Sequence, residues 1–73
     1  MMSAQEVKTP LRRAREARGL TIDEAAAKLG IDQGNLSRIE RGLQTPSKEA
    51  LAEIAREFDL SELEILYPER YVA

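Results

Sequence analysis

The sequence predicts an all-α domain, a compact arrangement of five short helices, and three observations support this prediction. Alanine, leucine, glutamate and arginine abound in the 73 residues, and all four favour helix over strand. Five stretches have apolar residues at helical spacing, and each follows a residue that caps helices. No stretch alternates apolar with polar residues in the manner of a half-buried strand, and the sequence contains no repeat.

The first two helices are predicted from residues that start and end helices. Pro10 stands just inside the start of the first helix, and Gly19 stands just past its end. Thr21 and Glu24 form a capping box before the second helix. Gly30 ends that helix, because glycine adopts left-handed backbone conformations at little cost. The two helices are expected over residues 10–18 and 22–29.

The other three helices are predicted in the same way. Asp32 caps the third helix, and Gly42 ends it. Ser47 opens the fourth helix, and Ser61 and Glu64 form a second capping box before the fifth. The third and fifth helices are expected over about residues 33–41 and 62–66. The fourth is expected to bury a stripe that consists of Leu51, Ile54, Ala55 and Phe58.

The chain is expected to form one small domain with flexible termini. Every predicted helix is shorter than about 14 residues, so none is stable alone and all five must share one core. We expect residues 1–9 to form a flexible N-terminal arm, residues 10–67 to form the folded domain, and residues 68–73 to form a C-terminal tail. Residues 69–73 of that tail are expected to fray, as chain ends commonly do.

The composition excludes several classes of protein. The chain contains no cysteine and no histidine, which removes disulfides, most zinc sites and most pairs of a nucleophile with a base. No apolar run is long enough to span a membrane, and the first nine residues lack the apolar stretch of a signal peptide. We therefore expect a cytoplasmic protein that is not an enzyme and that requires no cofactor, metal ion, membrane or small-molecule ligand.

Charge is distributed unevenly along the chain. The formal net charge is −2, but residues 1–41 carry eight basic and six acidic side chains, whereas residues 42–73 carry three basic and seven acidic ones. The basic excess therefore falls in the part that contains the second and third helices. This asymmetry is compatible with binding to a polyanion, but it indicates that affinity does not depend on bulk charge alone.

The second and third helices, joined by a turn at Gly30, form a pair of the size that places side chains in the DNA major groove. Leu36 and Ile39 are expected to hold the third helix against the core. The remaining face is polar, and its glutamine and arginines can each make two hydrogen bonds in a plane, as base edges require. A merely solvated helix face is the alternative. The polar face consists of Gln33, Gly34, Ser37, Arg38 and Arg41.

Several motifs in this region belong together. They are R-x-x-R-G-L over residues 15–20, the small residues Ala26 and Gly30, and S-R-I-E-R-G over residues 37–42. With them, residues 21–42 resemble the helix-turn-helix of the Cro/C1-type (XRE-like) regulators, the group of the phage 434 and lambda repressors. The resemblance covers about residues 11–66. It implies a five-helix fold like that of the lambda repressor DNA-binding domain, with the recognition helix, about residues 33–41, in the major groove.

The resemblance also implies roles for individual residues. Gln33 and Arg38 match positions that read bases, and Arg15 and Glu40 match a pair that forms a partly buried salt bridge. Contacts to bases are expected from Gln33, Gly34, Ser37 and Arg38. Contacts to DNA phosphates are expected from Thr21, Asn35, Arg41, Gln44, Thr45, Ser47 and Lys48.

Three positions leave alternatives open. Asn35 has an equal claim to read a base or to complete the cap of the third helix, besides its place among the expected phosphate contacts. Ser37 lies between the two base readers and binds a phosphate, a base or nothing. Ile22 stands where many members of the family carry a glutamine that binds a phosphate. That contact is therefore made by the backbone N–H group alone, or it is missing in this chain.

The resemblance implies a homodimer that forms through the last helix and the loop before it. A single small module buries too little DNA for strong specificity, which also favours pairing on two half-sites. Leu63 and Leu66 are expected to point inward, which leaves Ile65 for a partner. Tyr67 and Tyr71 have an alternative role, which is to cover the open end of the core. The expected dimer interface consists of Leu60, Ile65, Tyr67 and Tyr71.

The function that the resemblance implies is transcriptional regulation. The expected protein is a repressor that binds double-stranded DNA as a dimer on an inverted-repeat operator. An antitoxin that regulates its own operon through the same fold is one alternative, although only residues 1–8 or 67–73 are available to bind a toxin. An adaptor that binds only protein partners is the other, and the acidic net charge supports it.

Overall fold

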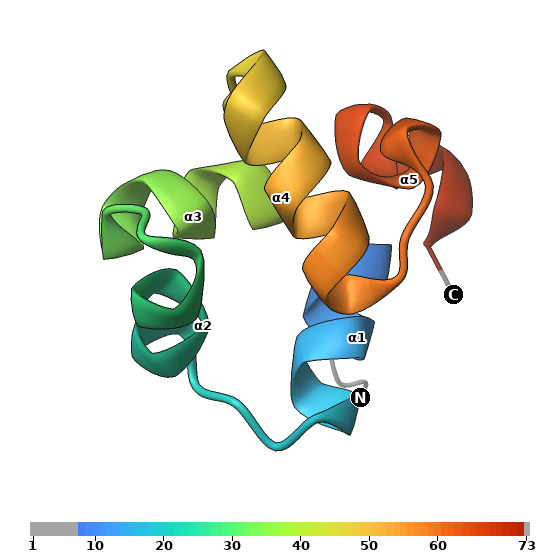
Figure 1. Cartoon of the computed structure of the whole chain (residues 1–73). Coiled ribbons are helices and arrows are strands. Elements are labelled where there is room, and N and C mark those ends of the chain that lie inside the picture. The colour runs from blue at the N-terminus through green and yellow to red at the C-terminus, as the bar shows by residue number, and fades with distance from the viewer. Residues whose placement is uncertain (1–7, 73) are drawn as a thin grey trace.

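The structure is a computed structural model that describes residues 8–72, and over that range it contains helices and no strand (Figure 1). The helices are α1 Pro10–Ala17, α2 Ile22–Leu29, α3 Gln33–Glu40, α4 Lys48–Phe58, α5 Glu62–Leu66 and the short 3-10 helix η1 Pro68–Tyr71. The predicted all-α fold with five α-helices is confirmed. In the described part of the chain, none of the helices has the length and apolar character needed to cross a bilayer.

Capping side chains determine where the helices begin. Thr21 accepts a hydrogen bond from the backbone N–H group of Glu24, and the Glu24 carboxylate accepts one from the N–H group of Thr21. Ser61 and Glu64 repeat this arrangement at the start of α5. Gly30 ends α2 with a φ of 69°, in the left-handed region. Both predicted capping boxes and the predicted conformation of this glycine are therefore confirmed.

One core joins all five α-helices. In Figure 1, α2 and α3 lie on one side of α4, and α5 with η1 lies on the other. The largest side chains that are fully buried are those of Phe58, Leu36 and Ile54. Burial of each such side chain contributes about 1.5–3 kcal/mol. The core cluster consists of Leu11, Ala25, Ala26, Leu36, Ile39, Ile54, Phe58 and Ile65.

Lys8 and Thr9, the described residues before α1, form hydrogen bonds with the domain, although the flexible arm is predicted over residues 1–9. Thr9 caps α1, and its hydroxyl donates a hydrogen bond to the Glu40 carbonyl oxygen at 2.7 Å. Arg13 donates to the carbonyl oxygens of Lys8 and Tyr71, at 2.6 and 2.9 Å. Residues 8 and 9 therefore make contacts with the domain, residues 1–7 lie outside the described residues, and the flexible arm stays a prediction.

The end of the chain is also more ordered than the prediction of fraying over residues 69–73. Pro68 is buried, and a Cβ atom built on Gly42 would lie only 3.0 Å from its Cγ atom. The 3-10 helix therefore packs on the backbone just after α3, where the absence of a side chain leaves room. The Arg70 guanidinium lies over the ring of Tyr67, 4.5 Å from its centre. The predicted domain boundary at residue 67 stays a prediction, and residue 73 is not described.

Glu16 is expected to titrate with a pKa of about 2 instead of the ordinary 4.5, because Lys8 and then Arg12 donate hydrogen bonds to its carboxylate. A lowered pKa means that its contribution to stability is present above about pH 4.5 and is lost as the pH falls towards 2. Solvent screens this exposed cluster, so the contribution is small. An NMR titration of the Glu16 carboxyl checks the prediction, and a midpoint near 4.5 would contradict it.

Candidate nucleic-acid interface

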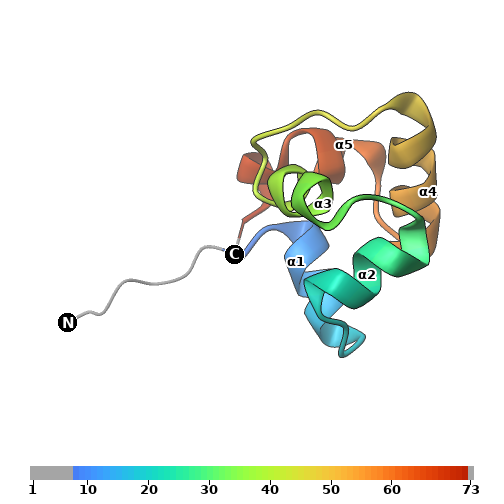
Figure 2. The same ribbon diagram turned by 90° about the vertical axis from the view of Figure 1, so that its left-hand side faces the viewer.

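Helix α3 is anchored by one face and exposes the other. Figure 2 views the molecule from the side on which α2 and α3 lie. On the inner side of α3, Leu36 is fully buried, and Ile39 and Glu40 are buried beside it. Helical residues four apart lie on the same face, so the outer surface has two adjacent ridges. One ridge carries Gln33, Ser37 and Arg41, and the other carries Gly34 and Arg38.

The turn between α2 and α3 holds the two helices as a pair. Ala26 is buried on α2, where its small side chain allows a close approach to the neighbouring helix. After Gly30, the N–H group of Ile31 donates to the Ala26 carbonyl oxygen at 3.0 Å. The Asp32 carboxylate then accepts a hydrogen bond from the N–H group of Asn35 and caps α3. The two short helices and this tight turn make a helix-turn-helix.

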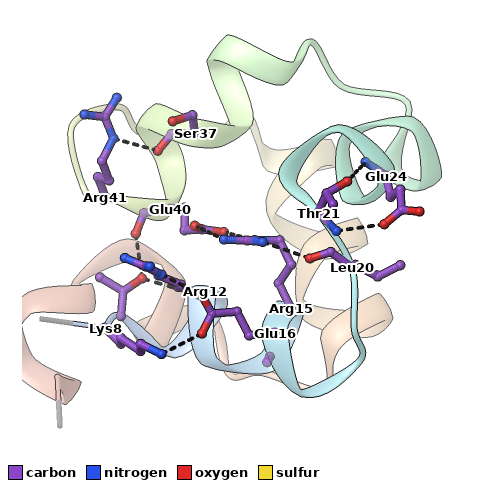
Figure 3. A network of polar contacts seen from close by, with 12 residues as sticks. Lys8, Arg12, Arg15, Glu16, Leu20, Thr21, Glu24, Ser37, Glu40 and Arg41 are labelled. Carbon is purple, nitrogen blue, oxygen red and sulfur yellow. Dashed lines mark hydrogen bonds and ion pairs between the residues drawn. The ribbon is translucent and has the colours of Figure 1, made fainter. Parts of the chain in front are cut away.

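Arg15 on α1 forms a salt bridge with Glu40 on α3, and Figure 3 shows this contact. The arginine Nε and Nη2 atoms donate to the two carboxylate oxygens at 2.8 and 2.9 Å, and Nη1 donates to the carbonyl oxygen of Leu20. The side chains of Arg15 and Glu40 are only 12% and 8% exposed. The hydrogen bonds to Glu40 raise the pKa of Arg15, against the opposing effect of burial. The expected salt bridge is therefore present in the structure.

Comparison with known proteins places this geometry in a family. The sequence model of the family described as "Helix-turn-helix" matches residues 11–65, from α1 to α5. The chain belongs to the Cro/C1-type helix-turn-helix family. The resemblance inferred from the motifs in residues 15–42 is thereby confirmed. The matched region includes α2 and α3, the two helices of the helix-turn-helix.

Two relatives from Sinorhizobium fredii (strain NBRC 101917 / NGR234) support the assignment. They are named uncharacterized HTH-type transcriptional regulators y4dL and y4dJ. Each is 38% identical to this chain over 56 residues, which is 77% of the chain. The matching part covers 29% of y4dL and 73% of y4dJ, so the chain spans less than a third of the first relative and most of the second.

The four predicted base contacts of this helix-turn-helix lie together on the outer face of α3. Gln33 and Arg38 are exposed, and Gly34 and Ser37 are half-buried. Arg38 does not extend freely from the helix, because Nε donates to the Gln44 side-chain oxygen at 2.8 Å and Nη2 donates to that of Asn35 at 2.6 Å. Sequence analysis missed both bonds. The three-residue spacing between Asn35 and Arg38 indicates their contact only in retrospect, and nothing in the sequence indicates the bond to Gln44.

The predicted phosphate contacts lie in different places on the helix-turn-helix. Asn35, Gln44 and Ser47 line one hollow of about 350 Å³ between α3 and the start of α4. Next to this hollow, Thr45 and Lys48 are exposed. Arg41 folds back and donates from Nε to the Ser37 carbonyl oxygen at 3.3 Å. Thr21 lies apart from the hollow, at the start of α2, where its hydroxyl oxygen accepts the capping bond.

The structure resolves the alternative for Asn35, since the carboxylate of Asp32 caps α3 and the Asn35 side chain does not. The side-chain oxygen of Asn35 instead accepts the bond from Arg38. An arginine has no acceptor, so the oxygen of the amide, and not its nitrogen, must face the guanidinium. Completion of the cap by the Asn35 side chain is therefore the wrong alternative, while its contact with a base or a phosphate stays a prediction.

The predicted orientation of α5 is wrong at two positions. Ile65 is 3% exposed and lies in the core, whereas Leu63 is 53% exposed. Ile65 faces inward because it is the fourth residue of α5, the position of a hydrophobic staple with Leu60, which packs against the same core cluster. Leu63 precedes it by two residues, about 200° around the helix, and therefore points outward. Ile65 is consequently removed from the expected dimer interface, whereas the half-buried Leu60 stays a prediction there.

Several apolar side chains stay exposed at the C-terminal end of the domain. Tyr67 and Tyr71, both expected at the interface, are 41% and 38% exposed. Tyr67 directly follows α5, and its N–H group donates to the Leu63 carbonyl oxygen at 2.9 Å. Leu43, which follows α3 and is 66% exposed, was missed by sequence analysis because a single apolar residue in a loop has no pattern.

Proposed function

We propose that this chain is a DNA-binding transcriptional regulator that acts as a repressor and binds an inverted repeat in double-stranded DNA as a homodimer. The observation that carries the proposal is the outer face of α3. From Gln33 to Arg41 that face is polar and carries no acidic side chain, while the one glutamate of the helix, Glu40, is buried and paired with Arg15. The exposed Asp32 precedes the face, and its carboxylate caps the helix. An exposed carboxylate on the face itself would repel the phosphates of a DNA groove.

In this proposal, α3 lies in the major groove and its outer ridges face the base edges. Gln33 can bond to an adenine through both groups of its amide, and Arg38 can bond to a guanine. Thr45, Ser47 and Lys48, together with the N-terminus of α4, face the phosphates and set the register of the helix on the duplex.

Selection of bound duplexes from a randomised pool tests the proposed function most directly. We expect the wild-type chain to enrich a two-part motif with inverted symmetry, and we expect binding to weaken steeply as the salt concentration rises. Absence of any enriched sequence would contradict the proposal and favour an adaptor that binds protein. Copurification of an inhibited toxin from cells would favour the antitoxin alternative.

Lys48→Ala is expected to weaken binding to all duplexes by the same factor and to reduce the salt slope by about one ion. Lys48 is exposed at the start of α4, and a lysine that contacts a phosphate carries no sequence information. Titrations against the selected duplex and a scrambled one at several salt concentrations provide the measurement. Lys28→Ala, which removes an equal charge from the pair with Glu57, is the matched control. A loss confined to the selected duplex would contradict the prediction.

Leu63→Glu is expected to convert the proposed dimer into a monomer without changing the thermal stability of the fold, because the side chain is exposed and contributes little to the core. Sedimentation equilibrium measures the state of association, and binding to a single half-site should stay while binding to the full repeat weakens. Ala52→Glu adds the same charge at an exposed position of α4 and is the control. An unchanged dimer would show that the apolar surface of α5 is not the interface.

A further inference from the structure

The side chain of Arg38 is held by one edge of its guanidinium group. Nε donates to the side-chain oxygen of Gln44 at 2.8 Å, and Nη2 donates to that of Asn35 at 2.6 Å. A guanidinium is a rigid, planar fork of five N–H donors. Nε and Nη2 share its side edge, so Gln44 in the loop and Asn35 in the first turn of α3 together fix both the position and the plane of the fork.

The other edge of the fork lies beside Gly34. A Cβ atom built at that position would lie 3.2 Å from Oδ2 of Asp32, and 3.5 and 3.9 Å from Nη1 and Nη2 of Arg38. The guanidinium therefore runs back along α3 towards its N-terminus, the end from which base-reading side chains of such helices project. The Asp32 carboxylate lies near this edge, but its Oδ2 atom accepts the N–H group of Asn35, and no ion pair joins it to Arg38 within residues 8–72. In that range Nη1 donates no hydrogen bond, so the end edge formed by Nη1 and Nη2 keeps donors for a ligand.

Two parallel donors distinguish guanine from the other bases in the major groove. Guanine presents two acceptors there, N7 and O6, whereas adenine presents one acceptor and one donor, and cytosine presents a donor. We propose that Asn35 and Gln44 are positioning residues that hold Arg38 by its side edge, so that its end edge is preset to read a guanine. This inference rests on the proposed function, and it gives the two amides a role other than phosphate binding.

Presetting matters because a free arginine side chain loses rotamer freedom when it binds. Immobilisation of one long side chain weakens binding about 2- to 12-fold, and a side chain that is already held avoids most of that loss. The acceptors also consume the donors of the side edge, which leaves the end edge as the bidentate surface. Removal of one acceptor should therefore reduce the preference for guanine without abolishing it.

The test compares Gln44→Met, which keeps the length of the side chain but removes the acceptor, with Gln44→Glu, which keeps an acceptor. In the free protein, water exchange of the Arg38 Nε–H group is expected to be slow in the wild type and in Gln44→Glu, and fast in Gln44→Met. In selections from a random duplex pool, Gln44→Met should lose guanine preference about 2- to 12-fold at the position that depends on Arg38. In an Arg38→Ala background, the same change should have no effect on that preference.

Gln44→Glu separates positioning from phosphate contact. Its added charge should weaken binding to every duplex alike, but the guanine preference should stay. Undiminished preference in Gln44→Met, together with uniformly weaker binding, would assign Gln44 to a phosphate and overturn this inference alone. A gain of preference, or selection of another base at that position, would overturn it as well. A wild-type chain that enriches no sequence would overturn the proposed function and this inference with it.

Discussion

Glu40→Ala is expected to lower the free energy of unfolding by about 3–5 kcal/mol, the largest effect expected of any single change at a polar position. Glu40 is 8% exposed, and both of its carboxylate oxygens accept bonds from Arg15, itself only 12% exposed. Loss of the carboxylate leaves a buried guanidinium without its partner, and the remaining bond to the Leu20 carbonyl does not balance the charge. Urea denaturation followed by circular dichroism measures the loss.

The matched control is Glu53→Ala, which removes a glutamate that pairs with Arg56 on the exposed face of α4. An exposed pair contributes at most about 1 kcal/mol, so this variant should unfold almost as the wild type does. A double change of Arg15→Met with Glu40→Leu should be less destabilising than Glu40→Ala, because no unpaired charge stays buried. If Glu40→Ala and Glu53→Ala unfold alike, the ion pair is not what fastens α3 to α1.

The helices could be predicted because their limits are set by neighbouring residues. The Thr21 and Glu24 box, the left-handed Gly30 and the Ser61 and Glu64 box act within one turn of the chain, so their spacing in the sequence equals their spacing in space. Residues that face the core of α3 and α4 follow from helical periodicity in the same way. All five α-helices and the exposed face of α3 could be predicted from these local rules.

The remaining features depend on contacts between distant positions. Pro68 packs on Gly42, and Arg13 bonds to the carbonyl groups of Lys8 and Tyr71, which are 63 positions apart. Because these contacts join distant positions, no local pattern in the sequence predicted the order at the two ends. Helix α5 has five residues, too few for periodicity to choose between its two faces. Its orientation was nonetheless implied by the hydrophobic staple, and that staple excluded the outward orientation of Ile65.

The candidate site was predicted in its composition but not in its internal bonds. The acid-free face of α3 is visible in the sequence because helical spacing gathers its residues. The contact of Arg38 with Gln44 crosses from α3 into the loop that follows it, and the path of that loop is set by packing and not by a capping rule. The sequence therefore predicts that Arg38 reads a base, but it does not predict which side chains orient Arg38.

Arg38→Ala is expected to lose discrimination at one base pair of each half-site by about 5- to 150-fold, which corresponds to the 1–3 kcal/mol of a good bidentate contact. The fold should stay intact, because Arg38 is exposed and, among residues 8–72, its side chain bonds to Asn35 and Gln44 at the surface. Titrations against the selected duplex and four versions of the base pair in question measure the discrimination, and thermal denaturation checks the fold.

Arg38→Lys separates the shape of the side chain from its charge. Lysine keeps the positive charge but lacks the planar fork, so it cannot present two parallel donors at a fixed spacing. We expect this variant to bind a scrambled duplex as the wild type does and to lose much of the preference for guanine. If Arg38→Ala weakens binding equally at all four base pairs, and Arg38→Lys restores it, then Arg38 contacts a phosphate, and the base-reading role of this ridge of α3 passes to Gln33 alone.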